Sequence, residues 1–115
     1  PFAWNTMIEA DRVRVFAGAP EAVKTPSNSG KGQQVRRCPS CRVAVWSNYG
    51  GNEKVRFVRV GTLDNASALP PDMHIFTSTN QPWVVLDPAT SAVDEYYSAA
   101  KYWPAESLER GKALR

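Results

Sequence analysis

The sequence predicts a mainly β protein, in which antiparallel sheets are followed by a short helical tail. Two observations lead to this prediction. Segments in which apolar and polar residues alternate fill most of the chain before residue 80, and helix-start signals occur only after residue 90. Because the strands come first and the helices last, the order argues against a parallel sheet of strand–helix–strand units. At 115 residues, the chain is expected to be a single domain over residues 1–115.

Four strands are expected in the first half of the chain. Residues 2–8 (FAWNTMI) are rich in aromatic and β-branched residues and residues 12–18 (RVRVFAG) alternate, which together predicts a hairpin. Residues 18–34 are rich in Gly, Pro, Ser and Asn, so a loop is expected there. Residues 34–38 and 42–50 are then predicted to be strands on either side of a Cys-Pro-Ser-Cys turn.

The clearest strand pattern of the chain is KVRFVRVGTL, residues 54–63. A loop with two prolines is expected at residues 64–72, and a short strand at residues 73–78. Residues 80–91 show no regular pattern and are expected to be irregular.

Two helices are expected in the last quarter. Ser91 and Asp94 have the spacing of a capping box ahead of residues 95–103 (EYYSAAKYW). Pro104 is suited to the start of a second helix over residues 104–115, which has acidic residues early and basic residues late, as the helix dipole favours.

The composition is that of an ordinary soluble protein, with 43% hydrophobic and 22% charged residues. No apolar run approaches the ~18 residues of a membrane-spanning helix. The net charge is only +3 and the two signs are interspersed, which argues against a nucleic-acid-binding protein. Since there is also no signal-peptide pattern, we expect a cytoplasmic protein that does not bind membranes.

The only two cysteines, Cys38 and Cys41, lie two residues apart. A thioredoxin-type redox pair needs a helix after its first cysteine to lower the thiol pKa, but a strand pattern follows here. A turn between two strands instead suits a zinc knuckle, in which both thiolates face one metal ion. Structural zinc needs four ligands, and the chain offers no third cysteine and one distant histidine, His74. The pair is therefore half of a zinc site or two free thiols.

The residues around and beyond this turn resemble the glutathione-dependent formaldehyde-activating enzyme family (Gfa), whose domain is shared with centromere protein V. The opening residues 2–18 and the C-terminal residues 96–115 are also similar to segments of this family. The matching motifs are Cys38-Pro-Ser-Cys41, Gly61-Thr62-Leu63-Asp64, Pro71, His74-Ile75-Phe76 and Pro82-Trp83.

The resemblance implies a fold of coiled antiparallel β-sheets pinned by zinc, of the β-tent type. In the family a structural zinc is held by an early Cys-x-Cys pair and a later Cys-x-x-Cys turn, and Cys38 and Cys41 match the later turn. A second zinc, tied to activity, uses a Cys-x-Cys-x-x-Cys cluster. This sequence begins just after the place where that cluster would end, so we expect the N-terminal zinc-binding segment to be missing from it.

The function implied by the resemblance is that of a carbon–sulfur lyase acting on adducts of glutathione or a related thiol, with zinc as cofactor. Without the second cluster, the chain itself is expected to be an inactive piece of an active parent. The alternative is a zinc-pinned binding module without catalysis, as in centromere protein V. Methionine-R-sulfoxide reductase ranks last, because it needs a late reactive cysteine and no cysteine follows Cys41. A homodimer is a further possibility, because two chains could together complete a four-thiolate zinc site.

Three residues of the matching motifs are candidates for substrate binding: Asp64, His74 and Trp83. Each also has a purely structural interpretation, as a turn residue, a strand residue and a core aromatic, respectively. Several basic residues near the cysteine turn could attract the carboxylates of glutathione or form a solvated sheet face. These basic residues are Arg36, Arg37, Arg42, Lys54, Arg56 and Arg59.

Overall fold

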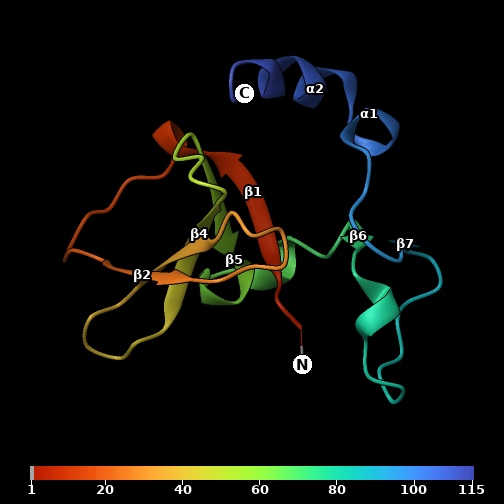
Figure 1. The fold of residues 1–115 in the computed structure, drawn as a ribbon, viewed down its shortest axis with the longest axis horizontal. Coiled ribbons are helices and arrows are strands. Elements are labelled where there is room, and N and C mark those ends of the chain that lie inside the picture. Colours follow the sequence, from red (N-terminus) through yellow and green to blue (C-terminus); the bar gives the residue numbers. More distant parts are fainter. Residues whose placement is uncertain (1) are drawn as a thin grey trace. The chain divides into compact units, whose positions relative to one another are not determined.

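The computed structural model describes residues 2–115, which form two compact units, one ending at Ala68 and the other beginning at Leu69 (Figure 1). The prediction of a single domain over residues 1–115 stays a prediction. The mainly β fold is confirmed, because a five-stranded antiparallel sheet dominates the first unit and α-helix occurs only near the C-terminus. Among the described residues, no helix has the length and apolar character needed to cross a membrane.

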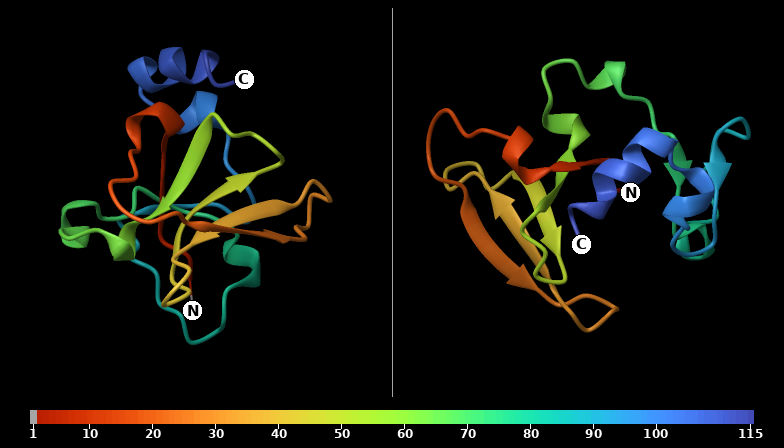
Figure 2. Two further views of the ribbon diagram at one scale, coloured as in Figure 1. Left: turned by 90° about the vertical axis from the view of Figure 1, so that its left-hand side faces the viewer. Right: turned by 90° about the horizontal axis from the view of Figure 1, so that it is seen from above.

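The sheet has the strand order β1-β5-β4-β3-β2, so β2 to β5 form a meander and β1 adds to its far edge. Figure 2 shows that the sheet is twisted and coiled rather than flat. The strands are β1 (Asn5–Glu9), β2 (Glu21–Thr25), β3 (Gln33–Arg37), β4 (Ala44–Tyr49) and β5 (Val55–Arg59).

The strands predicted on both sides of the cysteine turn are confirmed as β3 and β4, and β4 pairs with β5. Trp46 pairs with Val58 on one face of the sheet, and Ser47 pairs with Phe57 on the other. The turn between β4 and β5 uses Gly50 and Gly51, both with positive φ, a conformation that glycine adopts without strain. The predicted strand 54–63 ends early, since a 3-10 helix, η2 (Val60–Thr62), follows β5.

The hairpin predicted for residues 2–8 and 12–18 is wrong. β1 is followed by a 3-10 helix, η1 (Ala10–Arg12), and residues 13–18 contain no strand. β1 pairs instead with β5, in a register that sets Met7 opposite Phe57. The alternating segment 12–18 contains only two valines, and its Phe16 is 90% exposed. β5 instead sets the large apolar side chain of Phe57 opposite β1.

The loop predicted for residues 18–34 is also wrong, because this segment forms the β2–β3 hairpin, with Val23 opposite Val35. Its turn chemistry is confined to the tip. There Ser27 Oγ accepts a hydrogen bond from the Gly32 N–H at 3.0 Å, and the Ser27 carbonyl accepts one from the Gly30 N–H at 2.9 Å. Glycine and serine at the tip therefore obscured two short strands beside it.

Packing in the first unit centres on β4 and β5. The buried apolar side chains are Trp46, Val55 and Val60. Ser47 and Asn48 are buried polar residues, and Ser47 Oγ accepts hydrogen bonds from Gln33 Nε2 and Arg59 Nη2, both at 3.0 Å. A second short 3-10 helix, η3 (Ala66–Ala68), ends this unit.

The second unit contains two short strands, β6 (Met73–His74) and β7 (Ser91–Ala92), which pair in parallel, unlike the antiparallel pairs expected from the sequence. The predicted strand 73–78 stops after His74, because Phe76 has a left-handed backbone and a 3-10 helix, η4 (Thr77–Thr79), follows it. Backbone hydrogen bonds then continue the pairing, from the Val93 N–H to the His74 carbonyl and from the Phe76 N–H to the Glu95 carbonyl.

The helical tail is confirmed, but its first helix is shorter than predicted. The capping box at Ser91 is wrong, since Ser91 is in β7 and its backbone is already paired with β6. The helix α1 covers only Ala99–Tyr102, and α2 covers Ala105–Lys112 with Pro104 at its start, as predicted.

Candidate functional site

The first candidate site is the turn that connects β3 to β4 and carries both cysteines. The Cys38 N–H donates to the Val43 carbonyl and the Arg42 N–H donates to the Cys38 carbonyl, each at 2.9 Å. Arg42 has a left-handed backbone with φ of 65°, which lets the chain turn back into β4. Cys38 is half-buried, Cys41 is exposed, and both are free thiols.

This turn favours the thiolate form of Cys38. Hydrogen bonds from the backbone N–H groups of Cys41 and then Ser40 lower the pKa of the Cys38 thiol, because they stabilise its negative charge. The thiolate is the form of cysteine that binds metal ions. A redox pair of the thioredoxin type is not favoured, since strand β4 and not a helix follows the turn.

The donor chemistry of the turn fits zinc, but the number of donors does not complete a site. Two thiolates on one turn supply two of the four positions of a tetrahedral zinc. Within residues 2–115, no group of three or more His, Cys, Asp or Glu side chains is placed to hold a metal ion. The turn therefore supplies two of the four donors that a tetrahedral zinc site would need.

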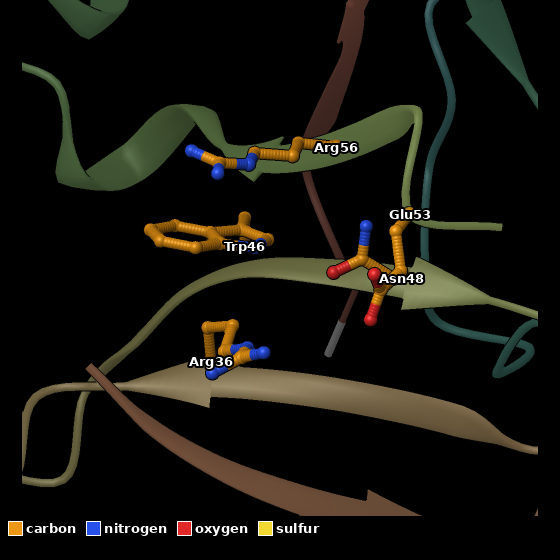
Figure 3. Close-up of a pocket in the computed structure, with 5 residues that line it drawn as sticks. All are labelled: Arg36, Trp46, Asn48, Glu53 and Arg56. Carbon is orange, nitrogen blue, oxygen red and sulfur yellow. The ribbon is translucent and has the colours of Figure 1, made fainter. Parts of the chain in front are cut away.

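The second candidate site is a pocket on the sheet face that carries Trp46, with a volume of about 270 Å³ (Figure 3). We call it the arginine pocket. Its lining residues are Arg36 from β3, Trp46 and Asn48 from β4, Glu53 from the β4–β5 turn and Arg56 from β5. Arg36 lies directly opposite Trp46 in the β3–β4 register, and the guanidinium carbon of Arg56 is 4.3 Å from the centroid of the Trp46 ring.

The six basic residues singled out from the sequence do not act as one group. Arg37 and Arg42 both pair with Glu21, at 2.9 Å and 2.5 Å, and these hydrogen bonds lower the pKa of the Glu21 carboxyl. Arg59 donates hydrogen bonds to Asn5 and Ser47 on the other sheet face. Only Arg36 and Arg56 line the pocket.

Residues 1–79 match the family model described as glutathione-dependent formaldehyde-activating enzyme. The chain belongs to this family. The matched residues include both cysteines, the whole arginine pocket, Asp64 and His74. No curated protein and no solved structure matches the chain.

The Gfa motif residues predicted to bind substrate lie in different units. Asp64 is exposed, between η2 and η3 in the first unit, whereas His74 and Trp83 belong to the second unit. His74 is on β6, and its Nε2 atom is buried without a hydrogen-bond partner among the described residues. Trp83 is 68% exposed, so it is not a core aromatic within its unit, and it lies beyond the part of the chain that matches the Gfa family.

The sequence did not single out Trp46, Asn48 or Glu53, which complete the arginine pocket. A signal was present for two of them, because the alternation of β4 sets Trp46 and Asn48 on the same face. Glu53 comes from a turn, and its position depends on how that turn folds back over the sheet.

Proposed function

We propose that this Gfa-family chain is the β domain of a carbon–sulfur lyase-type enzyme that acts on adducts of glutathione or a related thiol. The observation that carries the proposal is the family match over residues 1–79, within which the Cys38–Cys41 turn is built to present a thiolate. Zinc is the cofactor that this turn suits. We place the protein in the cytoplasm, where reduced thiols and glutathione coexist.

In this proposal, Cys38 and Cys41 provide two ligands of a structural zinc that fixes the β3–β4 turn. Further ligands come from outside residues 1–115 or from a second copy of the chain, which makes a homodimer part of the proposal. Metal binding of this kind adds to folding stability, because the unfolded chain has no preformed site. Substrate binding is assigned to Asp64, His74 and Trp83, of which His74 has a buried ring nitrogen without a hydrogen-bond partner among the described residues.

The reaction class needs a group that holds a thiolate or polarises an oxygen on the adduct carbon, and zinc supplies this chemistry when it is bound. Cys38 and Cys41 are the only cysteines of the sequence, so the second, activity-linked zinc of the family is not expected on residues 1–115 alone. We therefore assign turnover to a protein that carries the additional cysteines, and binding to the chain described here.

A second candidate is a zinc-pinned binding module without catalysis. The observation that favours it is that the described residues offer two cysteine thiols on one turn and no larger group of metal-binding side chains. Such a module would bind the thiol adduct, or another partner, without converting it.

The two candidates are separated by following the exchange of ¹³C-formaldehyde with its glutathione adduct by NMR, after addition of a zinc-loaded protein that joins this domain to the additional cysteines. Faster exchange supports the enzyme, and its loss in Cys38→Ser would tie it to the cysteine turn. Binding of the adduct with no change in exchange supports the module. If the protein neither binds the adduct nor changes its exchange, the glutathione-related function is wrong.

A further inference from the structure

We infer that the arginine pocket binds an α-amino-carboxylate group, the zwitterionic end of an amino acid. This inference rests on the proposed function, because in a glutathione adduct the group with this chemistry is the γ-glutamyl end. The pocket offers guanidinium groups for a carboxylate and a carboxylate for an ammonium group, within one hollow on a rigid sheet face.

Two arginines, Arg36 and Arg56, supply the positive charge of the pocket. Figure 3 shows Arg56 and Arg36 on opposite sides of Trp46. Arg56 is held in place by two contacts, because its Nη1 donates to the Val13 carbonyl at 2.9 Å and its guanidinium lies over the Trp46 ring. Arginine has five N–H donors in a fixed fork, so one bond to a carbonyl leaves most of them available for a ligand oxygen.

Arg36 is the free cation of the pocket. Its side chain has no hydrogen bond or ion pair with any other residue in the described part of the chain, although Arg37 next to it is paired with Glu21. Arg36 is half-buried, which strengthens an ion pair relative to one in bulk water. A carboxylate that enters the pocket can therefore bind Arg36 without first displacing a protein partner.

The ammonium-binding side consists of Glu53, with Asn48 beside it. Glu53 forms no ion pair with Arg36 or Arg56, although it lines the same pocket, so its carboxylate is available to a ligand. Asn48 is 7% exposed, and its Nδ2 donates to the Val55 carbonyl at 2.6 Å and to the Asn52 carbonyl at 3.3 Å. These bonds hold the backbone on both sides of Glu53.

The combination of charges selects among anions. Phosphate and simple dicarboxylates would be attracted by the two arginines but repelled by Glu53, whereas an α-amino-carboxylate satisfies both signs at once. In glutathione the γ-glutamyl end carries both charges on one carbon, and the glycine end carries a carboxylate alone. The volume of about 270 Å³ is slightly below the range of pockets that enclose a whole drug-sized ligand, which suits one end of a tripeptide.

The test uses S-methylglutathione, which retains the γ-glutamyl end but has no thiol to bind a metal. Binding is followed by ¹H–¹⁵N NMR, with the Trp46 indole N–H assigned by comparison with Trp46→Phe. We expect this signal to shift on titration. We also expect Arg36→Gln to weaken binding about tenfold, since it removes a half-buried charge-assisted hydrogen bond.

Glu53→Gln distinguishes an α-amino-carboxylate from a simple carboxylate. The second ligand is an analogue of S-methylglutathione that lacks the α-amino group. Glu53→Gln should weaken the binding of S-methylglutathione about threefold, as expected for an exposed ion pair, and leave the affinity for this analogue unchanged. Arg12→Gln is the matched control, since Arg12 is an exposed arginine outside the pocket, and it should change neither affinity. The NMR spectrum of each variant also reports whether it is folded.

The outcomes separate this inference from the proposed function. If S-methylglutathione binds without a shift at Trp46, or if Glu53→Gln weakens both ligands equally, the inference is overturned while the glutathione-related function stands. If free glutamate shifts the Trp46 signal but S-methylglutathione does not bind, α-amino-carboxylate binding by the pocket is supported and the proposed action on glutathione adducts is contradicted. If neither compound binds, the inference is overturned.

Discussion

The buried hydroxyl group of Ser47 provides a stability test of the five-stranded sheet. Ser47 is 0% exposed, and its Oγ accepts hydrogen bonds from Gln33 on β3 and Arg59 on β5, so it links three neighbouring strands. A hydrogen bond from a neutral donor contributes about 0.5–1.5 kcal/mol to stability, and one from a charged donor about 1.5–3 kcal/mol. Both donors are half-buried and partly regain water, so we expect Ser47→Ala to lower the free energy of unfolding by about 1.5–3 kcal/mol.

The assay is urea unfolding followed by far-UV circular dichroism. Ser67→Ala is the control, because it removes an exposed serine hydroxyl that bonds to Asn65 Oδ1 at 3.1 Å, and it should change the free energy of unfolding by less than about 0.5 kcal/mol. If Ser47→Ala also changes it by less than about 0.5 kcal/mol, Gln33 and Arg59 do not depend on this hydroxyl and the reasoning is refuted.

Three further predictions concern an ion pair, a turn and the metal. Glu21→Gln should reduce the loss of stability that occurs as the pH falls below about 5. The arginine bonds that lower the Glu21 pKa stabilise the fold above the unfolded pKa, and this stability is lost as the pH falls through the folded pKa. An unchanged dependence of the free energy of unfolding on pH, measured by urea unfolding, contradicts this. Gly51→Ala should lower the free energy of unfolding by about 1–2 kcal/mol, because φ is +76° there, while Gly61→Ala, with no such φ and open space around it, should have little effect. Purified monomer should contain much less than one zinc per chain by metal analysis. A dimer with stoichiometric zinc, which loses both the metal and the dimeric state in Cys41→Ser, would instead identify a four-thiolate site shared by two chains.

Local sequence patterns predicted the elements whose partners are adjacent in the chain. The alternation around Trp46 predicted strand β4, and Pro104 predicted the start of α2. The partner of β1 could not be predicted in the same way, because it pairs with β5, about fifty residues away, and a pattern of alternation does not identify the partner strand.

The β2–β3 hairpin and the capping box show two further limits of sequence patterns. The glycine and serine residues of the hairpin tip are typical of a loop, and the strand beside them, Glu21–Thr25, is too short to show a clear pattern of its own. At Ser91, a correct capping spacing was overridden by pairing with β6, because backbone groups used in a strand are not available to start a helix.

The candidate site was predictable to a similar extent. The spacing of Cys38 and Cys41 identified the turn, because both cysteines lie within four residues of sequence. The arginine pocket depends on the register of three strands, which brings Arg36, Trp46 and Arg56 together, and that register appears only in the folded sheet. The resemblance to the Gfa family identified the family correctly, but the roles of Asp64, His74 and Trp83 stay predictions.

The proposed function depends most on zinc binding by the cysteine turn of this Gfa-family domain. The most direct measurement is zinc K-edge X-ray absorption of the zinc-loaded protein, compared with the Cys38→Ser/Cys41→Ser double variant. We predict at least two sulfur ligands at about 2.3 Å from the zinc, and their complete loss in the double variant. A zinc bound only by nitrogen and oxygen, or a spectrum that the double variant leaves unchanged, would contradict zinc binding by this turn.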